Sequence, residues 1–163
     1  MPPHAAGTVP PVYEISTDAS RLDVHAIHAF LTRAYWSAGV PLTTVQRAVD
    51  NSLCVGAFLG TAQVGFARVV TDCATFGYLA DVYVLEAHRG HGLSRRLLDA
   101  LFQRPEVQGL RRIILATRDA HGLYAPYGFT PLAAPDRFME RHDPHVYKAR
   151  GAYAEEPPET VHG

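Results

Sequence analysis

Cysteine is scarce in this chain, since Cys54 and Cys73 are the only two among 163 residues. Both stand in apolar, strand-like runs, which favours reduced core side chains over a disulfide framework. Long apolar runs are missing as well, because no stretch approaches the roughly 18 residues of a membrane span. The first residues also lack the basic segment and apolar core of a signal peptide. These absences predict a cytoplasmic protein with no membrane partner.

An excess of charge of either sign is likewise absent: 15 Lys and Arg residues face 16 Asp and Glu residues, for a formal net charge of −1. Nucleic-acid-binding domains usually carry a basic patch, so we expect no nucleic-acid partner and a small molecule instead. A homodimer is left open. The length predicts one folded domain. We place it at residues 11–149, between a disordered segment at 1–10 and a flexible acidic tail at 150–163.

The most informative stretch runs from Tyr78 to Phe102. Its first seven residues are β-branched, aromatic or small, which predicts a strand with Leu79, Asp81 and Tyr83 on one face. The opposite face would carry Tyr78, Ala80, Val82 and Val84. A turn with two glycines follows at residues 89–92, and the leucines after it recur at helical spacing. The sequence therefore predicts a helix that begins at the glycines.

A strand, a glycine-rich turn and a helix in succession suit a phosphate group. The helix N-terminus presents unpaired backbone N–H groups and partial positive charge, and glycine lets an anion approach them. Two common phosphate loops are excluded, because the turn has neither the Gly-Lys-Ser/Thr ending of a P-loop nor the third glycine of the dinucleotide fingerprint. An ordinary strand–turn–helix remains the alternative at this point.

Other apolar runs predict the rest of a sheet. Residues 52–59 and 63–70 flank a glycine-containing turn and predict a hairpin. Residues 111–117 predict a buried strand, parallel to the Tyr78 strand because a helix connects the two. The remaining expected elements are a first strand at 12–15, a helix capped by Asp18 or Ser20, a helix after Pro41, a short helix capped by Asp119 and a last strand at 137–141.

Two short motifs stand in order along the chain. Arg89, Gly92 and Ser94 follow the pattern Arg/Gln-x-x-Gly-x-Gly/Ala except at the serine, and residues 123–129 follow Leu/Phe-Tyr-x-x-x-Gly-Phe. Both patterns resemble those of the GNAT superfamily of acetyl-CoA-dependent N-acyltransferases, in which the first binds the pyrophosphate of coenzyme A. The resemblance implies an α/β (α+β) GNAT fold. Its twisted, mixed but mostly antiparallel sheet is splayed at the acetyl-CoA site and flanked by about four helices.

The resemblance also implies an activity. GNAT proteins transfer the acetyl group of acetyl-CoA directly to an amine in a ternary complex. We therefore expect acetyl-CoA as cosubstrate and a primary amine of a small molecule, or of a peptide, as acceptor. A non-catalytic acyl-CoA-binding domain, acting as sensor or structural partner, is the alternative. No metal is expected, because His25 and His28 share a helical face but no carboxylate or cysteine joins them.

Two residues are candidates for catalysis. By the resemblance, Tyr124 is the general acid that protonates the departing thiolate, and a phenol with a pKa of about 10 carries its proton at neutral pH. Simple packing of its ring is the alternative. Asp81 is the candidate general base for the acceptor, because an unpaired carboxylate is costly to bury in a strand. It could equally pair with Arg68 or Arg118.

Binding residues follow from the same resemblance. Backbone groups at the end of the Tyr78 strand are expected to hold the pantetheine and the thioester carbonyl, and the turn to hold the pyrophosphate. The expected cofactor-binding residues are Val82, Tyr83, Val84, Arg89, Gly90, His91, Gly92, Leu93 and Ser94. For the acceptor we expect an aromatic wall with one cation, which suits a small amine that also carries a carboxylate. The candidates are Tyr35, Trp36, Phe66, Arg68 and Tyr78, of which Trp36 and Phe66 could equally be core.

Overall fold

The structure, a computed structural model, describes residues 7–148. Its centre is a five-stranded sheet in the order β1-β2-β3-β4-β5, in which only the β4–β5 pair is parallel. The strands are β1 (Tyr13–Ser16), β2 (Leu53–Leu59), β3 (Ala62–Thr71), β4 (Phe76–Val84) and β5 (Arg112–Ile114). The helices are α1 (Val24–Leu31), α2 (Leu42–Asp50), α3 (Leu93–Phe102) and α4 (His121–Tyr124). The predicted mixed, mostly antiparallel sheet with flanking helices is confirmed.

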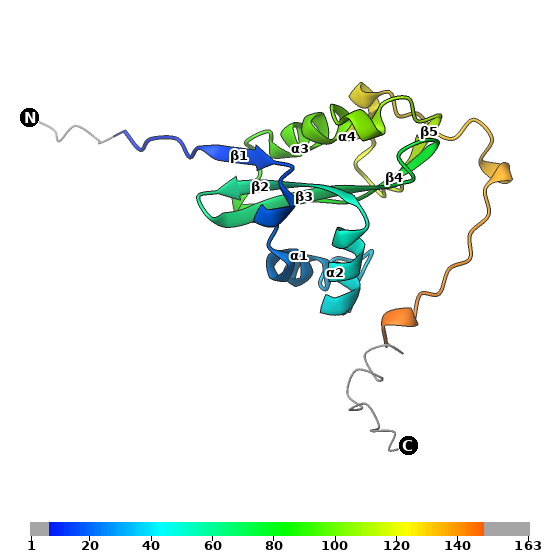
Figure 1. Cartoon of the computed structure of the whole chain (residues 1–163), viewed down its shortest axis with the longest axis horizontal. Coiled ribbons are helices and arrows are strands. Elements are labelled where there is room, and N and C mark those ends of the chain that lie inside the picture. The colour runs from blue at the N-terminus through cyan, green and yellow to red at the C-terminus, as the bar shows by residue number, and fades with distance from the viewer. Residues whose placement is uncertain (1–6, 149–163) are drawn as a thin grey trace, which may run out of the picture.

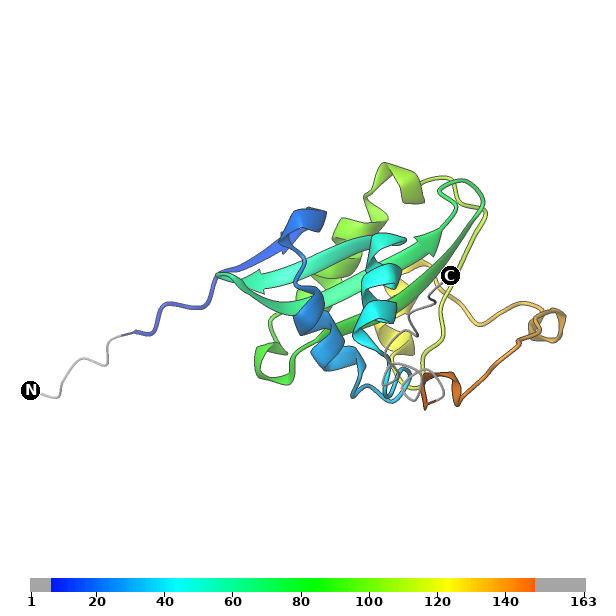
Figure 2. The same ribbon diagram turned by 60° about the horizontal axis from the view of Figure 1, so that its bottom comes forward.

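The helices cover the sheet from both sides. Helices α3 and α4 lie over one face, and α1 and α2 lie over the other (Figure 1). Figure 2, in which α1 and α2 come forward, shows these two helices crossing the strands. After α4 the chain runs away from the body and comes back on the side of α1 and α2, where Tyr147 packs.

Each face of the sheet has its own core. On the α3 side, four leucines are at most 2% exposed and explain why this segment forms a helix against the sheet: Leu93, Leu97, Leu98 and Leu101. Burying each such side chain contributes about 1.5–3 kcal/mol. The core on the other side joins residues of the α1–α2 region to the strands, namely Ile27, Leu31, Val40, Val45, Cys54, Phe66 and Tyr83.

The first helix begins later than the sequence predicted. Asp23 caps α1, since its side chain accepts a bond from the N–H of Ala26 at 3.0 Å. Asp18, the expected cap, serves only the 3-10 turn Ala19–Arg21, and Ser20 lies within that turn. Several capping residues precede the helix, and local sequence does not select among them. Packing of Ile27 and Leu31 on the sheet makes the choice.

Three further expectations are wrong. Residues 115–117 do not continue β5, and residues 137–141 form no strand in the described structure. Cys73 is exposed in the β3–β4 turn with a φ of 61°, whereas Cys54 is buried as expected. Apolar or β-prone composition indicates what a segment tolerates, but a strand needs a partner edge within reach. Residues 115–117 have no such partner, because β4 pairs with β5 only as far as Tyr78.

An extra residue in β4 changes where its side chains point. Ala67 of β3 faces both Asp81 and Val82, so the ladder contains a β-bulge, and Asp81 takes a φ of 54°. Beyond the bulge the alternation is reversed: Leu79 packs in the α3-side core, whereas Tyr83 packs in the α1-side core. The prediction of one shared face for Leu79, Asp81 and Tyr83 is therefore wrong, because a period of two assumes an unbroken ladder.

Candidate active site

A turn rich in glycine leads from β4 to α3. Gly90 and Gly92 have φ values of 83° and 70°, a region that favours glycine, and a Cβ at either would meet no atom within 4 Å. The N–H of Arg96 bonds to the carbonyl of Gly92 at 3.2 Å, so the N–H groups before it have no partner within the helix. The turn lines a hollow of about 210 Å³ with Val84, His88, Arg89, Gly90, Gly92, Leu93, Ser94, Arg95 and Leu123. This geometry suits an anion.

The turn is braced by side chains on both of its flanks. Arg89 donates from Nε to the carbonyl of Val84 at 3.0 Å, so the turn folds back on the end of β4. Nδ1 of His88 lies 2.9 Å from the Tyr13 hydroxyl of β1. The ring of His91, expected at the cofactor, lies 5.2 Å from that of Tyr13 between centroids. The conformation of the turn is thus fixed before any ligand arrives, which lowers the entropic cost of binding.

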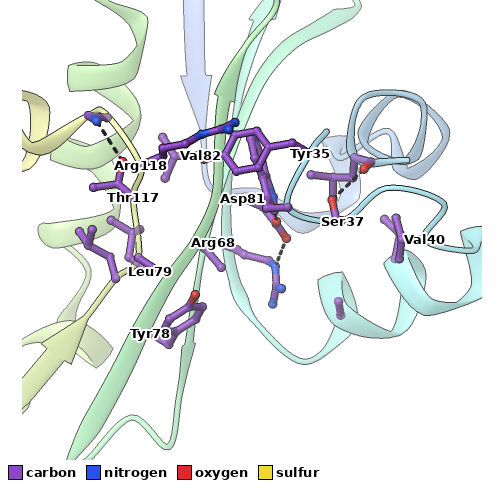
Figure 3. A pocket seen from close by; sticks show the side chains of 18 of the residues that line it. Tyr35, Ser37, Val40, Arg68, Tyr78, Leu79, Asp81, Val82, Thr117 and Arg118 are labelled. Atoms are coloured by element: carbon purple, nitrogen blue, oxygen red, sulfur yellow. Dashed lines mark hydrogen bonds and ion pairs between the residues drawn. The ribbon is translucent and has the colours of Figure 1, made fainter. Parts of the chain in front are cut away.

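A larger pocket of about 650 Å³ opens where β4 and β5 separate. The two strands pair only as far as Tyr78 and Ile114, in agreement with the splay that the resemblance to GNAT proteins implied. Leu79 and Val82 line the pocket from the α3 side of the sheet, whereas Arg68 lines it from the α1 side. The pocket is therefore continuous from one face of the sheet to the other (Figure 3).

The two cavities adjoin along β4 and α4. Val84 lines the hollow and Val82 lines the larger pocket; likewise Leu123 lines the hollow and Tyr124 the larger pocket. An elongated ligand with its phosphates at the N-terminus of α3 can therefore follow β4 and reach the larger pocket.

Tyr124 lies at the wall of this pocket and is 9% exposed. Its ring meets that of Phe129 edge to face, with centroids 6.1 Å apart. No described residue bonds to its hydroxyl, and no fully buried polar side-chain atom in residues 7–148 lacks a partner. The hydroxyl oxygen is therefore not sealed in the core. Burial, and to a smaller extent Tyr35, raises the pKa of this phenol above its usual 10.0, so it keeps its proton at neutral pH.

Tyr127 has different surroundings. Its hydroxyl donates to Oδ1 of Asp99 at 2.7 Å and lies 3.0 Å from the carbonyl of Arg95, so it ties the segment after α4 to α3. Burial and the bond to Asp99 raise its pKa to about 12. This tyrosine serves the packing of α3 and does not line the pocket.

Asp81 is held by two donors. Its Oδ2 accepts from Nε of Arg68 at 2.7 Å, and its Oδ1 accepts from Nε1 of Trp36 at 2.8 Å. Arg68 also donates to the Ser52 hydroxyl at 2.9 Å. The alternative of pairing with Arg68 is thus realised, whereas Arg118 makes a different contact. Each carboxylate oxygen retains capacity for one more bond, which an acceptor can use.

The other predicted acceptor residues separate into two groups. Tyr35, Trp36 and Tyr78 are at least 36% exposed and line the pocket. Phe66 is fully buried in the α1-side core, with its ring 6.2 Å from that of Tyr83, so the structure places it in the core instead. The Tyr83 side chain belongs to the same core, which leaves only its backbone for a cofactor.

Several pocket residues were not predicted. Thr117 and Arg118 follow β5, and Tyr147 comes from the last described turn of the chain. The only sequence signal for Thr117 and Arg118 was that they are polar and directly follow an apolar run. Asp119, which we expected to cap α4, lines the pocket and does not cap the helix. The residue before α4 is Ala120, whose N–H is bonded by the Thr117 hydroxyl at 3.0 Å.

The histidines of α1 are not brought together with other metal ligands. Nε2 of His28 lies 3.0 Å from the carbonyl of Val40, and His25 is exposed. Within residues 7–148 no three His, Cys, Asp or Glu side chains gather as metal ligands would. No helix in the same part of the chain is long and apolar enough to cross a bilayer.

A splayed sheet beside a glycine-rich helix N-terminus is the arrangement described above. Comparison with known proteins assigns a chain with this arrangement to a class of acetyltransferases. The model of the acetyltransferase (GNAT) domain matches residues 50–131. An inferred acetyltransferase of Gibberella zeae is 36% identical, and the match covers 69% of this chain and 75% of that protein. The chain belongs to the GNAT acetyltransferase family.

Solved structures agree with this assignment. An inferred GNAT acetyltransferase of Xanthomonas campestris pv. campestris is 54% identical, with a TM-score of 0.81 over 84% of this chain and 97% of that one. A predicted acetyltransferase of Clostridium acetobutylicum was solved with acetyl-CoA. It is 18% identical, with a TM-score of 0.58 over 80% of this chain and 95% of that one. The second likeness concerns the fold alone.

Proposed function

We propose that the protein transfers the acetyl group of acetyl-CoA directly to the primary amine of a small molecule in a ternary complex. The observation that carries this proposal is the pair of adjoining cavities, one suited to an anion at α3 and one that crosses the sheet beside Tyr124. Acetyl-CoA has a pyrophosphate toward one end and a thioester at the other. The fold shared with the Clostridium acetobutylicum protein, which was solved with acetyl-CoA, supports acetyl-CoA as the cosubstrate.

Main-chain groups hold the cosubstrate in this proposal. The N–H groups of residues 90–94 receive the pyrophosphate, and the terminal nitrogens of Arg89 add charge while its Nε stays on Val84. Backbone groups of residues 82–84 hold the pantetheine and the thioester carbonyl. Because the bulge turns Val82 and Val84 toward the α3 side and Asp81 away from it, the acceptor approaches from the α1 side.

The chemical step transfers one acetyl group from sulfur to nitrogen and releases one proton to solvent. The acceptor arrives as an ammonium ion and must lose a proton before its nitrogen can attack, and Asp81 is the carboxylate that lines the pocket on the acceptor side. The amine nitrogen then forms a bond to the acetyl carbon as the bond from that carbon to sulfur breaks. Tyr124 donates its proton to the leaving thiolate and regains one from the attacking nitrogen, which loses its second proton as it becomes the amide nitrogen. The products are an amide, coenzyme A with a free thiol and one proton released to solvent.

The test measures free thiol released from acetyl-CoA in the presence of a panel of primary amines. We expect release that depends on one class of amine and an amide of the matching mass. A protein that only binds acyl-CoA would instead gain thermal stability with acetyl-CoA and release no thiol in response to any amine. That result would overturn the proposed transfer and leave the binding domain as the function.

A further inference from the structure

Four charged side chains line the larger pocket: Arg68, Asp81, Arg118 and Asp119. Arg68 and Asp81 neutralise each other through their contact at 2.7 Å. Arg118 has no carboxylate within 4.0 Å among the described residues, and Asp119, its exposed neighbour in the sequence, forms no ion pair with it there. The cation that sequence reasoning assigned to the acceptor, Arg68, is therefore already matched, and Arg118 is the cation that a ligand can use.

Arg118 is an exposed arginine that stacks on an aromatic ring at the wall of the pocket. It leaves the segment after β5, and its Cζ lies 3.7 Å from the centre of the Tyr35 ring (Figure 3). The close-up shows this side chain reaching from the β5 side of the gap toward the acceptor side, where Asp81 is drawn. A guanidinium stacked by its face keeps its N–H donors free at its edge. Tyr35 thus holds a planar fork of donors at the pocket.

We propose that Arg118 binds a carboxylate of the acceptor, so that the acceptor is a small zwitterionic amine of the amino-acid type. This inference rests on the proposed acetyl transfer and specifies its substrate class. The ammonium group lies toward Asp81, near the thioester, and the carboxylate meets Arg118 in a bidentate pair. The carbon skeleton lies against the exposed rings of Tyr35, Trp36 and Tyr78.

Charge decides between classes of acceptor. A phosphate monoester carries close to two negative charges at neutral pH, whereas the lining offers one unmatched guanidinium, which fits the single charge of a carboxylate. A lysine side chain of a folded protein has no carboxylate near its amine, and neither does the N-terminus of a long peptide. The site therefore favours a free small molecule over a peptide or protein acceptor.

The experiment compares matched acceptors. Each pair consists of an α-amino acid and the amine that remains when its carboxyl group is removed, for example phenylalanine and phenethylamine. For the wild-type protein we expect kcat/KM to be higher for the amino acid by about 10- to 100-fold, the range of a hydrogen-bonded charge pair. The preference should shrink at high ionic strength, because salt screens an exposed pair.

Substitution of Arg118 assigns the preference to this side chain. In Arg118→Gln the preference should fall by about 10-fold or more, through KM of the amino acid and not of acetyl-CoA. Arg118→Lys keeps the charge but not the planar fork of donors, so it should retain part of the preference for the amino acid. Arg112→Gln is the matched control, because Arg112 is also an exposed arginine stacked on an aromatic ring, that of Phe138 at 5.2 Å, and does not line the pocket.

Each outcome has a distinct meaning. If wild-type protein acetylates both members of a pair equally, or prefers the decarboxylated amine, the carboxylate assignment is overturned while acetyl transfer stands. If Arg118→Gln lowers activity toward both members by the same factor, Arg118 supports the fold of the site and does not read the carboxylate. Absence of any thiol release that depends on an amine would overturn the transfer itself and this inference with it.

Discussion

Tyr124 is the residue on which the proposed chemistry depends most. Replacement by phenylalanine keeps the ring and its contact with Phe129 but removes the proton that the thiolate needs. We expect kcat to fall by about 10² to 10⁴-fold, the usual worth of a positioned acid. KM for acetyl-CoA should change little, since the turn before α3 is untouched. Steady-state kinetics of thiol release measures both parameters.

Tyr127→Phe is the control for this substitution. The Tyr127 hydroxyl bonds to Asp99 on α3, so its loss should cost about 1 kcal/mol of stability and leave kcat near that of the wild type. A thermal melt and the same kinetic assay separate the two effects. If Tyr127→Phe were the inactive variant and Tyr124→Phe were active, the motif would have pointed to the wrong tyrosine.

Asp81→Asn tests the proposed base. Asparagine tolerates positive φ and has the same shape as aspartate, but its NH2 group replaces one acceptor oxygen, so the bond from either Arg68 or Trp36 is lost. At pH 7 we expect kcat/KM to fall by about 10²-fold. The loss should become smaller toward pH 10, because the free amine is then abundant without a base. The measurement is the pH dependence of kcat/KM for both proteins.

Ser52→Ala separates the two roles that Asp81 can play. This variant removes the other hydrogen bond of Arg68, which runs to the Ser52 hydroxyl at 2.9 Å, and leaves the Asp81 carboxylate in place. We expect its pH profile to keep the shape of the wild-type profile. A loss in Asp81→Asn that is equal at all pH values, and is shared by Ser52→Ala, would mean that the ion pair supports the structure and that Asp81 is no base.

At the scale of elements, the turn between β4 and α3 decides whether the cosubstrate binds. Gly92→Val adds a branched Cβ at a φ of 70°, where the atoms would project into open space beside the helix N-terminus. We expect a weakening of acetyl-CoA binding by at least about 100-fold, because phosphate oxygens can no longer approach the N–H groups. Isothermal titration calorimetry gives the affinity.

Gly109→Val provides a matched comparison for backbone strain. Gly109 has a φ of 76° and open space around its missing Cβ, as Gly92 has, but it follows α3 and lines neither pocket. Both variants should lose a similar amount of stability, of the order of 1–2 kcal/mol. Only Gly92→Val should lose acetyl-CoA binding. Equal affinities for the two folded variants would refute the pyrophosphate site.

The stability of the whole molecule should depend on pH above pH 9. Burial raises the pKa of the Cys54 thiol from 9.0 to about 11, so the folded state keeps a proton that the unfolded chain loses. The stabilisation is complete below pH 9 and disappears as pH rises toward 11, for a total of about 3 kcal/mol. Denaturant titrations between pH 8 and pH 10 measure the slope, to which Tyr83, Tyr124 and Tyr127 add as pH nears 10 because their pKa values are raised as well.

Two cysteine variants check the source of that slope. Cys54→Ala should be less stable at pH 8 but should lose less stability than the wild type between pH 9 and pH 10, because only the tyrosines then contribute. Cys73→Ala changes an exposed residue of the β3–β4 turn and should keep the wild-type slope. A slope in Cys54→Ala as steep as that of the wild type would assign the pH dependence to other groups.

The sequence by itself determined what local patterns can encode. Leucine spacing predicted α3, alternation and glycine predicted the β2–β3 hairpin, and the turn at residues 89–92 predicted a helix N-terminus suited to phosphate. These features depend on neighbours within one element, whose geometry repeats every 3.6 or every two residues. The motif at residues 123–129 likewise located Tyr124, which lies at the wall of the larger pocket.

Tertiary structure alone decided how the site is assembled. One extra residue in β4, opposite Ala67, reverses the faces beyond Asp81, and period-two reasoning cannot detect it. The contacts of Asp81 come from residues 13 and 45 positions away, so the choice between a free and a paired carboxylate was open until the chain folded. The same holds for Phe66 in the core and for Arg118 on Tyr35, because burial and charge pairing depend on which distant segments meet.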